Sequence, residues 1–220
     1  ILESIEEVFD SPLLKQVDYR SVLLYTVLFF FVVEEYLRLR KRTALKKGYV
    51  PELKGVVTEE DYKKSHDYNM YKNNFGFLAD TYSTVTSMLV MYFWPRLWEL
   101  SSGIVANSAL AQVCFFSLFT TLIEQCLGMP VAILITFHIE EKFGFNKQTA
   151  ATFIGDTVKG LLVNLVLGAI LNLGMIYTVM WAGPSAWFYL WVFITLFALI
   201  MNMLYPIVCA PLFNTFTPLE

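Results

Sequence analysis

The chain has 220 residues, of which 56% are hydrophobic and only 16% are charged, and its formal net charge is −3. A soluble domain carries roughly 25% charged residues, so this chain has more apolar surface than one soluble core can bury. A negative chain has no general attraction for a polyanion, which excludes nucleic acid as the expected partner. The composition predicts an all-α, polytopic membrane helical bundle.

About five segments are long and apolar enough to cross a bilayer. Hydrocarbon about 30 Å thick needs roughly 20 helical residues, because each residue advances 1.5 Å and every backbone amide must be bonded internally. In chain order, the predicted spans cover approximately residues 17–37, 75–94, 100–127, 160–180 and 186–205.

Aromatic residues and prolines predict the limits of these spans. Trp94, Pro95 and Trp98 are typical of an interface and predict the end of the second helix. No charged side chain occurs in residues 160–219, a run long enough for two crossings. The sequence Trp181-Ala-Gly-Pro-Ser-Ala-Trp187 interrupts this run and predicts a tight turn at a headgroup layer.

Two polar stretches separate the apolar blocks. Residues 38–60 begin with six basic side chains, and Thr58 with Asp61 predicts a helix-capping box. Residues 61–74 are expected to form a polar helix on the membrane surface. Residues 129–159 are expected to be too polar to cross.

The basic cluster also predicts the orientation of the chain. Lysine and arginine resist translocation, so the segment after the first span is expected in the cytosol and the amino terminus in the lumen. Because the crossings alternate sides, residues 140–147 and 214–220 are then also cytosolic.

Several polar side chains fall at membrane depth, where they are costly and are functional hypotheses by default. These candidates are Asp80, Glu124, Asn164, Asn172 and Asn202. A structural interpretation stays open beside the functional one, because asparagines often bond across helix interfaces and the two carboxylates can reach water near helix ends.

No catalytic motif is visible in the sequence. His138 is followed by Ile139, Glu140 and Glu141, but a zinc-binding His-Glu-x-x-His helix needs a second histidine four positions on, where this chain has Lys142. His66 lies in the polar helix beside Asp67, as a surface histidine would. We therefore expect no catalytic residue, metal ligand or bound cofactor in this chain.

Residues 139–149 read Ile-Glu-Glu-Lys-Phe-Gly-Phe-Asn-Lys-Gln-Thr. This string resembles the pattern E-E-K-x-G-F-N-x-x-T of the CAAX prenyl protease 1 family of membrane zinc metalloproteases, and two further strings resemble the same family. Residues 210–220 are similar to P-x-F-x-x-F-T-P-L. Pro51-Glu-Leu followed by residues 62–68 resembles P-E-L with F-x-K-S-R-x-Y, although His66 occupies the arginine position.

The resemblance implies that residues 1–220 are the amino-terminal transmembrane domain of such a protease, half of a helical barrel around a water-filled chamber. The absence of an initial methionine agrees with a piece of a longer protein. The parent enzyme would be a zinc hydrolase of the endoplasmic reticulum and nuclear envelope that processes prenylated proteins. Its zinc ligands would lie in a carboxyl-terminal catalytic domain beyond residue 220. The chamber would hydrate the polar candidates at membrane depth.

The resemblance also suggests residues for domain docking or the substrate groove. In residues 139–149, Gly144 allows a turn, Phe143 and Phe145 are expected to pin it to the membrane face, and nearby polar groups to cap it. We expect docking of the catalytic domain there rather than substrate contact. The prenylated CAAX peptide is expected to pass beside the segment after the last span. The combined candidates are Glu140, Glu141, Asn146, Asn214, Phe216 and Pro218.

Two other classes of function remain as alternatives. A transporter or channel would use Asp80 and Glu124 as ion or proton sites, and would favour inverted repeats, for which the two halves give no convincing sign. A scaffold would bind a partner through its cytosolic loops.

Overall fold

The computed structural model describes residues 17–48, 57–106 and 108–213. The described residues contain helices and connecting turns but no strand. The helices contribute to two compact units, which are described in turn. One comprises Tyr19–Phe93 and Ile123–Gln148, and the other, within the described residues, comprises residues 94–122 and 149–213 apart from residue 107.

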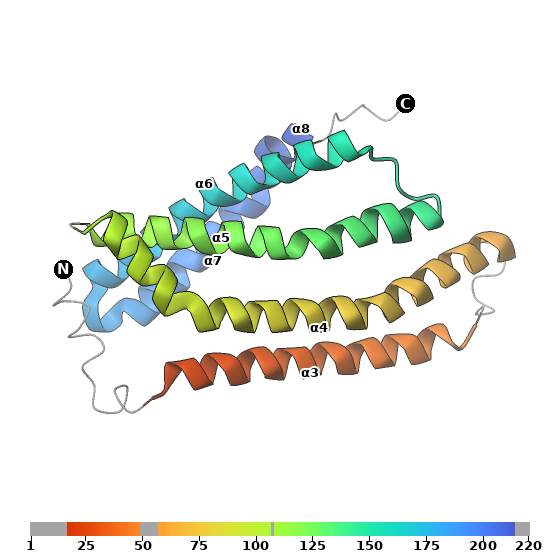
Figure 1. The fold of residues 1–220 in the computed structure, drawn as a ribbon, viewed down its shortest axis with the longest axis horizontal. Coiled ribbons are helices and arrows are strands. Elements are labelled where there is room, and N and C mark those ends of the chain that lie inside the picture. Colours follow the sequence, from red (N-terminus) through yellow and green to blue (C-terminus); the bar gives the residue numbers. More distant parts are fainter. Residues whose placement is uncertain (1–16, 49–56, 107, 214–220) are drawn as a thin grey trace. The chain divides into compact units, whose positions relative to one another are not determined.

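The first unit is built on two antiparallel helices, α3 (Tyr19–Leu45) and the greater part of α4 (Glu59–Ile104) (Figure 1). The Thr58 side chain accepts a hydrogen bond from the Asp61 amide at 3.1 Å, and its hydroxyl lies 2.6 Å from the Asp61 carboxylate. This confirms Thr58 as the cap of α4, although Asp61 is bonded to the Thr58 hydroxyl rather than to the backbone amide that a complete capping box uses.

The predicted surface helix over residues 61–74 is wrong as a separate element, because α4 is one continuous helix of 46 residues. At 1.5 Å per residue it is about 70 Å long, more than twice the hydrocarbon thickness, so it extends well beyond the bilayer. No glycine or proline occurs in residues 61–74 to end the helix before the apolar segment begins.

The predicted end of the helix at Pro95 is also wrong. Proline removes one helical hydrogen bond, here to the carbonyl of Met91, and its ring crowds that carbonyl, which can kink a helix without ending it. The helix α4 continues to Ile104. The next helix, α5 (Ala109–Leu134), therefore begins nine residues after the predicted start of the third span at residue 100. Pro130 is likewise accommodated within α5.

The polar stretch 129–159 is more helical than predicted. A π-helical turn, η2 (Ile135–Glu140), continues α5, and α6 (Ala150–Ala182) begins at Ala150. Thr149 caps α6 by accepting a hydrogen bond from the Thr152 amide at 3.2 Å. The connection between the helical segments is only residues 143–149.

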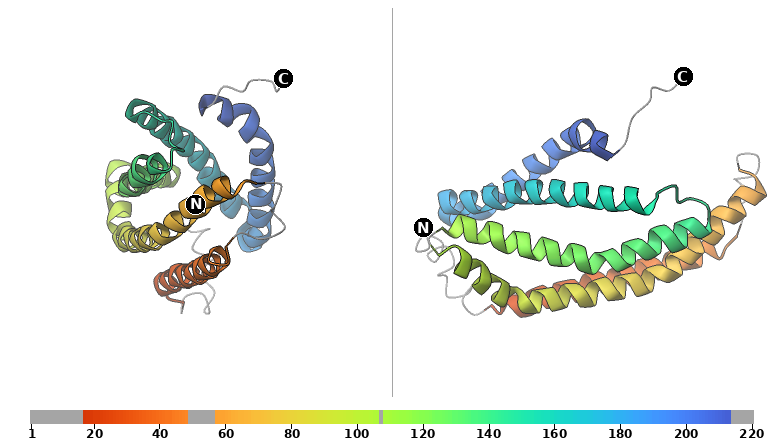
Figure 2. Two further views of the ribbon diagram at one scale, coloured as in Figure 1. Left: turned by 90° about the vertical axis from the view of Figure 1, so that its right-hand side faces the viewer. Right: turned by 45° about the horizontal axis from the view of Figure 1, so that its top comes forward.

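In the second unit, α6 and α7 (Ala186–Leu204) form an antiparallel hairpin (Figure 2). The turn η3 (Gly183–Ser185) lies within the predicted sequence, and Gly183 has a φ of +54° that favours glycine. Farther along the hairpin, a Cβ on Gly174 would overlap the ring of Phe193, so glycine permits this close approach. The π-turn η4 (Tyr205–Cys209) and α8 (Ala210–Phe213) follow α7.

Within the described residues, two helical stretches meet a length and hydropathy criterion for crossing a membrane: Ala109–Glu140 and Ala150–Phe213. The second has 64 residues and contains the η3 turn, so it is long enough for two crossings. Glu34, Glu35 and Arg38 in α3, and the polar beginning of α4, reduce the apolar character of those two helices.

Candidate functional site

A cluster of charged side chains joins α3 to α4. The Arg38 guanidinium forms an ion pair with Asp80, and its Nε donates to Oε1 of Glu35 at 3.1 Å. Its Nη1 also donates to the backbone carbonyl of Asn73 at 3.4 Å. The side chains of Arg38, Asp80 and Glu35 are only 20%, 32% and 13% exposed. Arg38 thus neutralises two carboxylates that would be costly alone in an apolar environment.

Gly76 leaves the space for this cluster. A Cβ at position 76 would overlap the guanidinium of Arg38, so the side chain lies directly over the glycine. Gly76 is one helical turn before Asp80 and therefore on the same face of α4. The sequence analysis assigned Arg38 to a solvated basic loop and missed this cluster. Two spacings in the sequence could have indicated this cluster. Glu35 and Arg38 are three residues apart and Gly76 and Asp80 are four residues apart, so the members of each pair share a helix face.

Glu124 lies beside a row of hydroxyl groups in the same unit. With seven other residues of α4 and α5 it lines a cavity of about 110 Å³. The hydroxyl-bearing neighbours are Tyr82, Ser83, Thr86 and Ser87. Tyr82 donates to the Leu127 carbonyl at 3.0 Å. Glu124 therefore lies on a polar helix surface. The residues that line its cavity do not include those of the Arg38 cluster.

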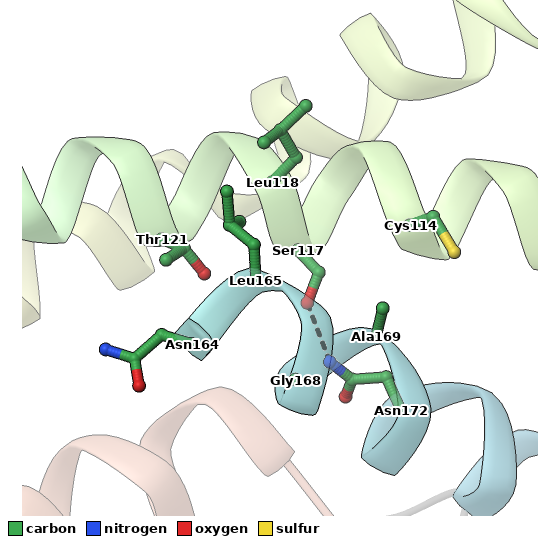
Figure 3. A pocket seen from close by; sticks show the side chains of 9 residues that line it. All are labelled: Cys114, Ser117, Leu118, Thr121, Asn164, Leu165, Gly168, Ala169 and Asn172. Atoms are coloured by element: carbon green, nitrogen blue, oxygen red, sulfur yellow. Dashed lines mark hydrogen bonds between the residues drawn. The ribbon is translucent and has the colours of Figure 1, made fainter. Parts of the chain in front are cut away.

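Two of the asparagine candidates line one cavity in the second unit. Asn164 and Asn172 on α6 face a space of about 190 Å³ that Ser117 and Thr121 of α5 also line (Figure 3). Asn172 Nδ2 donates to Ser117 Oγ at 2.7 Å, a bond between helices as the structural interpretation expects. Asn164 points away from that pair in Figure 3.

Asn202 is positioned differently from the other two asparagines. Its side chain is exposed on α7 and donates to the Ala198 carbonyl of the same helix at 2.9 Å. This bond satisfies one amide donor locally without a second helix. Asn202 therefore does not join Asn164 and Asn172 at their cavity.

Glu140, Glu141 and Asn146 lie at and just beyond the end of the helix formed by α5 and η2. The Gly144 amide donates to the Glu141 carbonyl at 3.0 Å, and the Phe145 amide donates to the Glu140 carbonyl at 2.8 Å. Gly144 has a φ of +74°, which completes a Schellman-type cap. The Asn146 side chain accepts from the Gln148 amide at 2.7 Å. The predicted tight turn at Gly144 is confirmed.

Aromatic side chains hold this turn against the polar beginning of α4. Tyr68 packs edge-on against Phe143 and Phe145, with ring centroids 5.5 Å and 4.8 Å away. The ammonium of Lys142 lies 4.2 Å from the centroid of the Tyr71 ring, within cation–π range. We call this contact region, Tyr68, Tyr71, Lys142, Phe143 and Phe145, the aromatic junction.

Charged groups border the aromatic junction. Lys72 Nζ lies 4.0 Å from Glu140 Oε1, whereas Glu141 is exposed and has no ion pair within the described residues. Nε2 of His138 lies 3.4 Å from the Tyr71 hydroxyl. The junction therefore presents polar groups around an apolar centre, an arrangement typical of interaction surfaces.

His66, at the position where the resembling pattern has arginine, connects the start of α4 to the end of α3. Its Nε2 lies 3.0 Å from the Leu45 carbonyl and its Nδ1 lies 3.1 Å from Oδ1 of Asp67. Tyr62, one turn earlier, donates to the Gly48 carbonyl at 2.7 Å. These contacts fix the end of α3 against the polar part of α4.

The described residues do not provide a metal site. In residues 17–48, 57–106 and 108–213, no group of three or more His, Cys, Asp or Glu side chains is placed to hold a metal ion. These residues therefore do not fit a catalytic zinc, which needs three protein ligands. The remaining groove candidates, Asn214, Phe216 and Pro218, lie outside the described residues.

The long apolar helices and the polar groups they pair internally define an all-α, polytopic membrane protein. A family model described as the CAAX prenyl protease N-terminal region, with five membrane helices, matches residues 39–215. The chain therefore belongs to the CAAX prenyl protease family, which confirms the resemblance and the prediction of about five spans.

Several curated relatives bear the name CAAX prenyl protease 1 homolog. The protein from Oryza sativa subsp. japonica is 33% identical over 210 residues, and the human protein is 30% identical over 226 residues. These alignments cover 91% and 98% of this chain, but 49% and 47% of the relatives. The chain thus spans about half the length of these relatives.

A solved structure shares the fold. The crystal structure of S. mikatae Ste24p matches 93% of this chain with a TM-score of 0.78, at 24% sequence identity. The match covers 49% of the Ste24p chain, in agreement with the extent of the sequence matches.

We predict that Arg38 and Asp80 are energetically coupled. In a double-mutant cycle of Arg38→Gln and Asp80→Asn, unfolding free energies measured in mixed micelles should give a coupling of about 1–3 kcal/mol, because the pair is largely shielded from water.

The matched control is the pair Arg96 and Glu99, whose nitrogen and oxygen lie 3.0 Å apart but whose side chains are 79% and 64% exposed. The substitutions Arg96→Gln and Glu99→Gln should couple by less than about 0.5 kcal/mol. Equal coupling in the two cycles would show that Arg38 and Asp80 gain nothing from their shielded position.

Proposed function

We propose that this chain forms the chamber wall of a zinc metalloendopeptidase that removes the carboxyl-terminal tripeptide of prenylated CAAX proteins. The observation that carries the proposal is the family match over residues 39–215. The similar proteins of rice and human are named CAAX prenyl protease 1 homologs, and this chain matches about half of each.

The polar cavities support a chamber filled with water. Ser83, Thr86 and Ser87 beside Glu124 provide a hydrophilic helix face, which is inexpensive in a membrane only where water or protein covers it. In the second unit, Asn164 and Thr121 line a further polar cavity. We assign these faces to the chamber, where water would hydrate Glu124 and Asn164.

The chain's own contribution is to bind and enclose the substrate. Zinc, which activates water for peptide hydrolysis in such enzymes, would be held by a carboxyl-terminal domain, as the resemblance to the family implies. Asn214, Phe216 and Pro218 are proposed to border the groove for the peptide tail. The bilayer, that domain and the prenylated peptide are the partners.

The aromatic junction is the proposed docking surface for the catalytic domain. Backbone hydrogen bonds and aromatic contacts shape the turn, which leaves the exposed carboxylate of Glu141 available to a partner. Glu140 is partly engaged by Lys72, and Asn146 stabilises the local backbone. A turn that is already rigid loses little conformational entropy when the catalytic domain docks on it.

The transporter alternative receives no support from the geometry of Asp80. Its carboxylate is paired with Arg38, which fills the position that a transported cation would occupy. The family match favours the peptidase for the same chain.

We place the chain in the membrane of the endoplasmic reticulum and the contiguous nuclear envelope, with the amino terminus in the lumen. The support for this orientation is the basic segment at the end of α3 and just beyond it, in which residues 40–47 carry five basic and no acidic side chains. The end after α8 would then be cytosolic.

We predict that the gene product containing residues 1–220 releases the carboxyl-terminal tripeptide from a farnesylated CAAX peptide. Peptide cleavage in purified proteoliposomes, followed by mass spectrometry, should be abolished by a zinc chelator and restored by added zinc. Residues 1–220 alone should cleave nothing.

The matched substrate control is the same peptide without its farnesyl group. A gene product without a His-Glu-x-x-His sequence, or one that cleaves neither peptide when folded, would contradict the proposed peptidase.

We predict that replacing both Glu140 and Glu141 by alanine in that gene product weakens docking. The turn itself should survive, because its hydrogen bonds use backbone atoms. Activity per folded molecule should fall about tenfold, equivalent to about 1.4 kcal/mol, and limited proteolysis should release the catalytic domain faster.

The control is the alanine pair at Glu59 and Glu60, two adjacent exposed glutamates in the first turn of α4. Those changes should leave activity per folded molecule within twofold. Unchanged activity and proteolysis in the Glu140 and Glu141 variant would remove the docking role while leaving the peptidase proposal intact.

We predict that a glycosylation acceptor appended before Ile1 is modified in microsomes of the endoplasmic reticulum, because that end is lumenal. A gel shift reversed by endoglycosidase measures this. Modification of an acceptor inserted within residues 38–47, with none at Ile1, would reverse the orientation.

A further inference from the structure

One face of α3 beyond its apolar segment forms a shallow hollow of about 390 Å³. Six residues line it: Tyr36, Leu39, Arg40, Thr43, Ala44 and Lys47. The first five share one face of α3 at spacings of three, four and seven, and Lys47 lies in the turn that follows the helix. All six are exposed. The hollow thus combines two cationic side chains with two hydroxyl groups and a small apolar floor.

This face lies on the opposite side of α3 from Arg38. At about 100° per residue, Tyr36 and Arg40 are both within roughly 20° of the direction opposite Arg38. Arg38 is paired with Asp80 of α4, so the hollow is turned away from that contact. Within the described residues, neither Arg40 nor Lys47 forms an ion pair. Their charges are available to an external anion.

The position of the hollow along α3 matches the headgroup layer of a bilayer. From Arg20 to Arg40 the helix advances about 30 Å, the thickness of the hydrocarbon core. Between them α3 exposes large apolar side chains, among them Leu23, Phe29 and Val32. Tyr36 then falls at the edge of the hydrocarbon, where tyrosine is favoured, and Arg40 and Lys47 fall among the phosphates.

We propose that this face of α3 binds the phosphate-bearing headgroup of an anionic phospholipid. The Arg40 guanidinium and the Lys47 ammonium would contact phosphate oxygens, and the hydroxyl of Tyr36 would donate a further hydrogen bond; the hydroxyl of Thr43 already donates to the Leu39 carbonyl at 3.0 Å. The acyl chains would lie along Leu39 and the apolar part of α3. The inference needs only that α3 crosses the bilayer, and it is independent of the proposed peptidase activity.

The bilayer as the source of the ligand follows from the surroundings of the hollow. A soluble phosphate compound would gain only the polar contacts, whereas a lipid also covers the exposed apolar surface directly below them. Several basic residues immediately beyond a membrane helix are typical of recognition of anionic lipids.

The test is native mass spectrometry of the full chain in detergent with phosphatidylinositol or phosphatidylcholine of identical acyl chains. Phosphatidylinositol should be retained about tenfold more tightly. The double variant Arg40→Gln with Lys47→Gln should lose that preference, and circular dichroism should be unchanged because both side chains are exposed.

The matched control is Lys41→Gln with Arg42→Gln, which removes the same charge from the same segment but from the side of Arg38. It should change retention by less than twofold. Equal losses in both variants would show diffuse attraction rather than a site, and no loss in the Arg40 and Lys47 variant would also overturn the proposal.

A last arm separates the lipid from a soluble ligand. Glycerophosphoinositol, which has the headgroup without acyl chains, should not displace the lipid at a hundredfold excess. Full displacement would assign the hollow to a soluble phosphate compound and overturn the lipid assignment.

Discussion

The cost of leaving a polar group unpaired in hydrocarbon is the constraint on which the structure depends. Lipid cannot accept or donate hydrogen bonds, so each backbone and side-chain group needs a partner in the protein or in enclosed water. Arg38 meets this requirement for Glu35 and Asp80 together, and also donates to a backbone carbonyl of α4. Asn172 meets it with Ser117. Where several polar groups remain beside a cavity, as around Glu124, the same constraint calls for water.

Small residues make these pairings possible. Hydrophobic attraction between helices is weak in lipid, so close packing and polar bonds must hold them together. Gly76 leaves the space in which Arg38 reaches Asp80, and Gly174 lets the ring of Phe193 approach the backbone of α6. In the two cases glycine serves different partners, a guanidinium and an aromatic ring, but both depend on the absence of a Cβ. At these two positions glycine therefore permits a close neighbour and does not break the helix.

The sequence predicts the class of the fold well because span length and apolar composition are physical requirements of the bilayer. The five spans, the turn near Gly183 and the cap at Thr58 all follow from local patterns. The limits of α4 do not, because neither Pro95 nor the polar residues 61–74 break a helix by themselves. The pairing of Arg38 with Asp80 needs the register of two helices, which a single sequence does not contain. Likewise the aromatic junction joins Tyr68 to Phe145 across 77 positions of chain.

Two arginines that lie two residues apart show how one basic segment can serve two purposes. Arg38 faces α4 and forms an internal ion pair with Asp80, whereas Arg40 lies on the other side of α3 and lines the hollow. The positive-inside rule counts both as topological signals, yet of the two arginines it is Arg40 that, with Lys47, lines the hollow proposed for an anionic lipid. The basic segment as a whole can therefore set the orientation of the chain in the membrane, while one of its faces separately binds an anionic lipid. Because a helix repeats every 3.6 residues, a shift of two positions is enough to assign two neighbouring charges to opposite tasks.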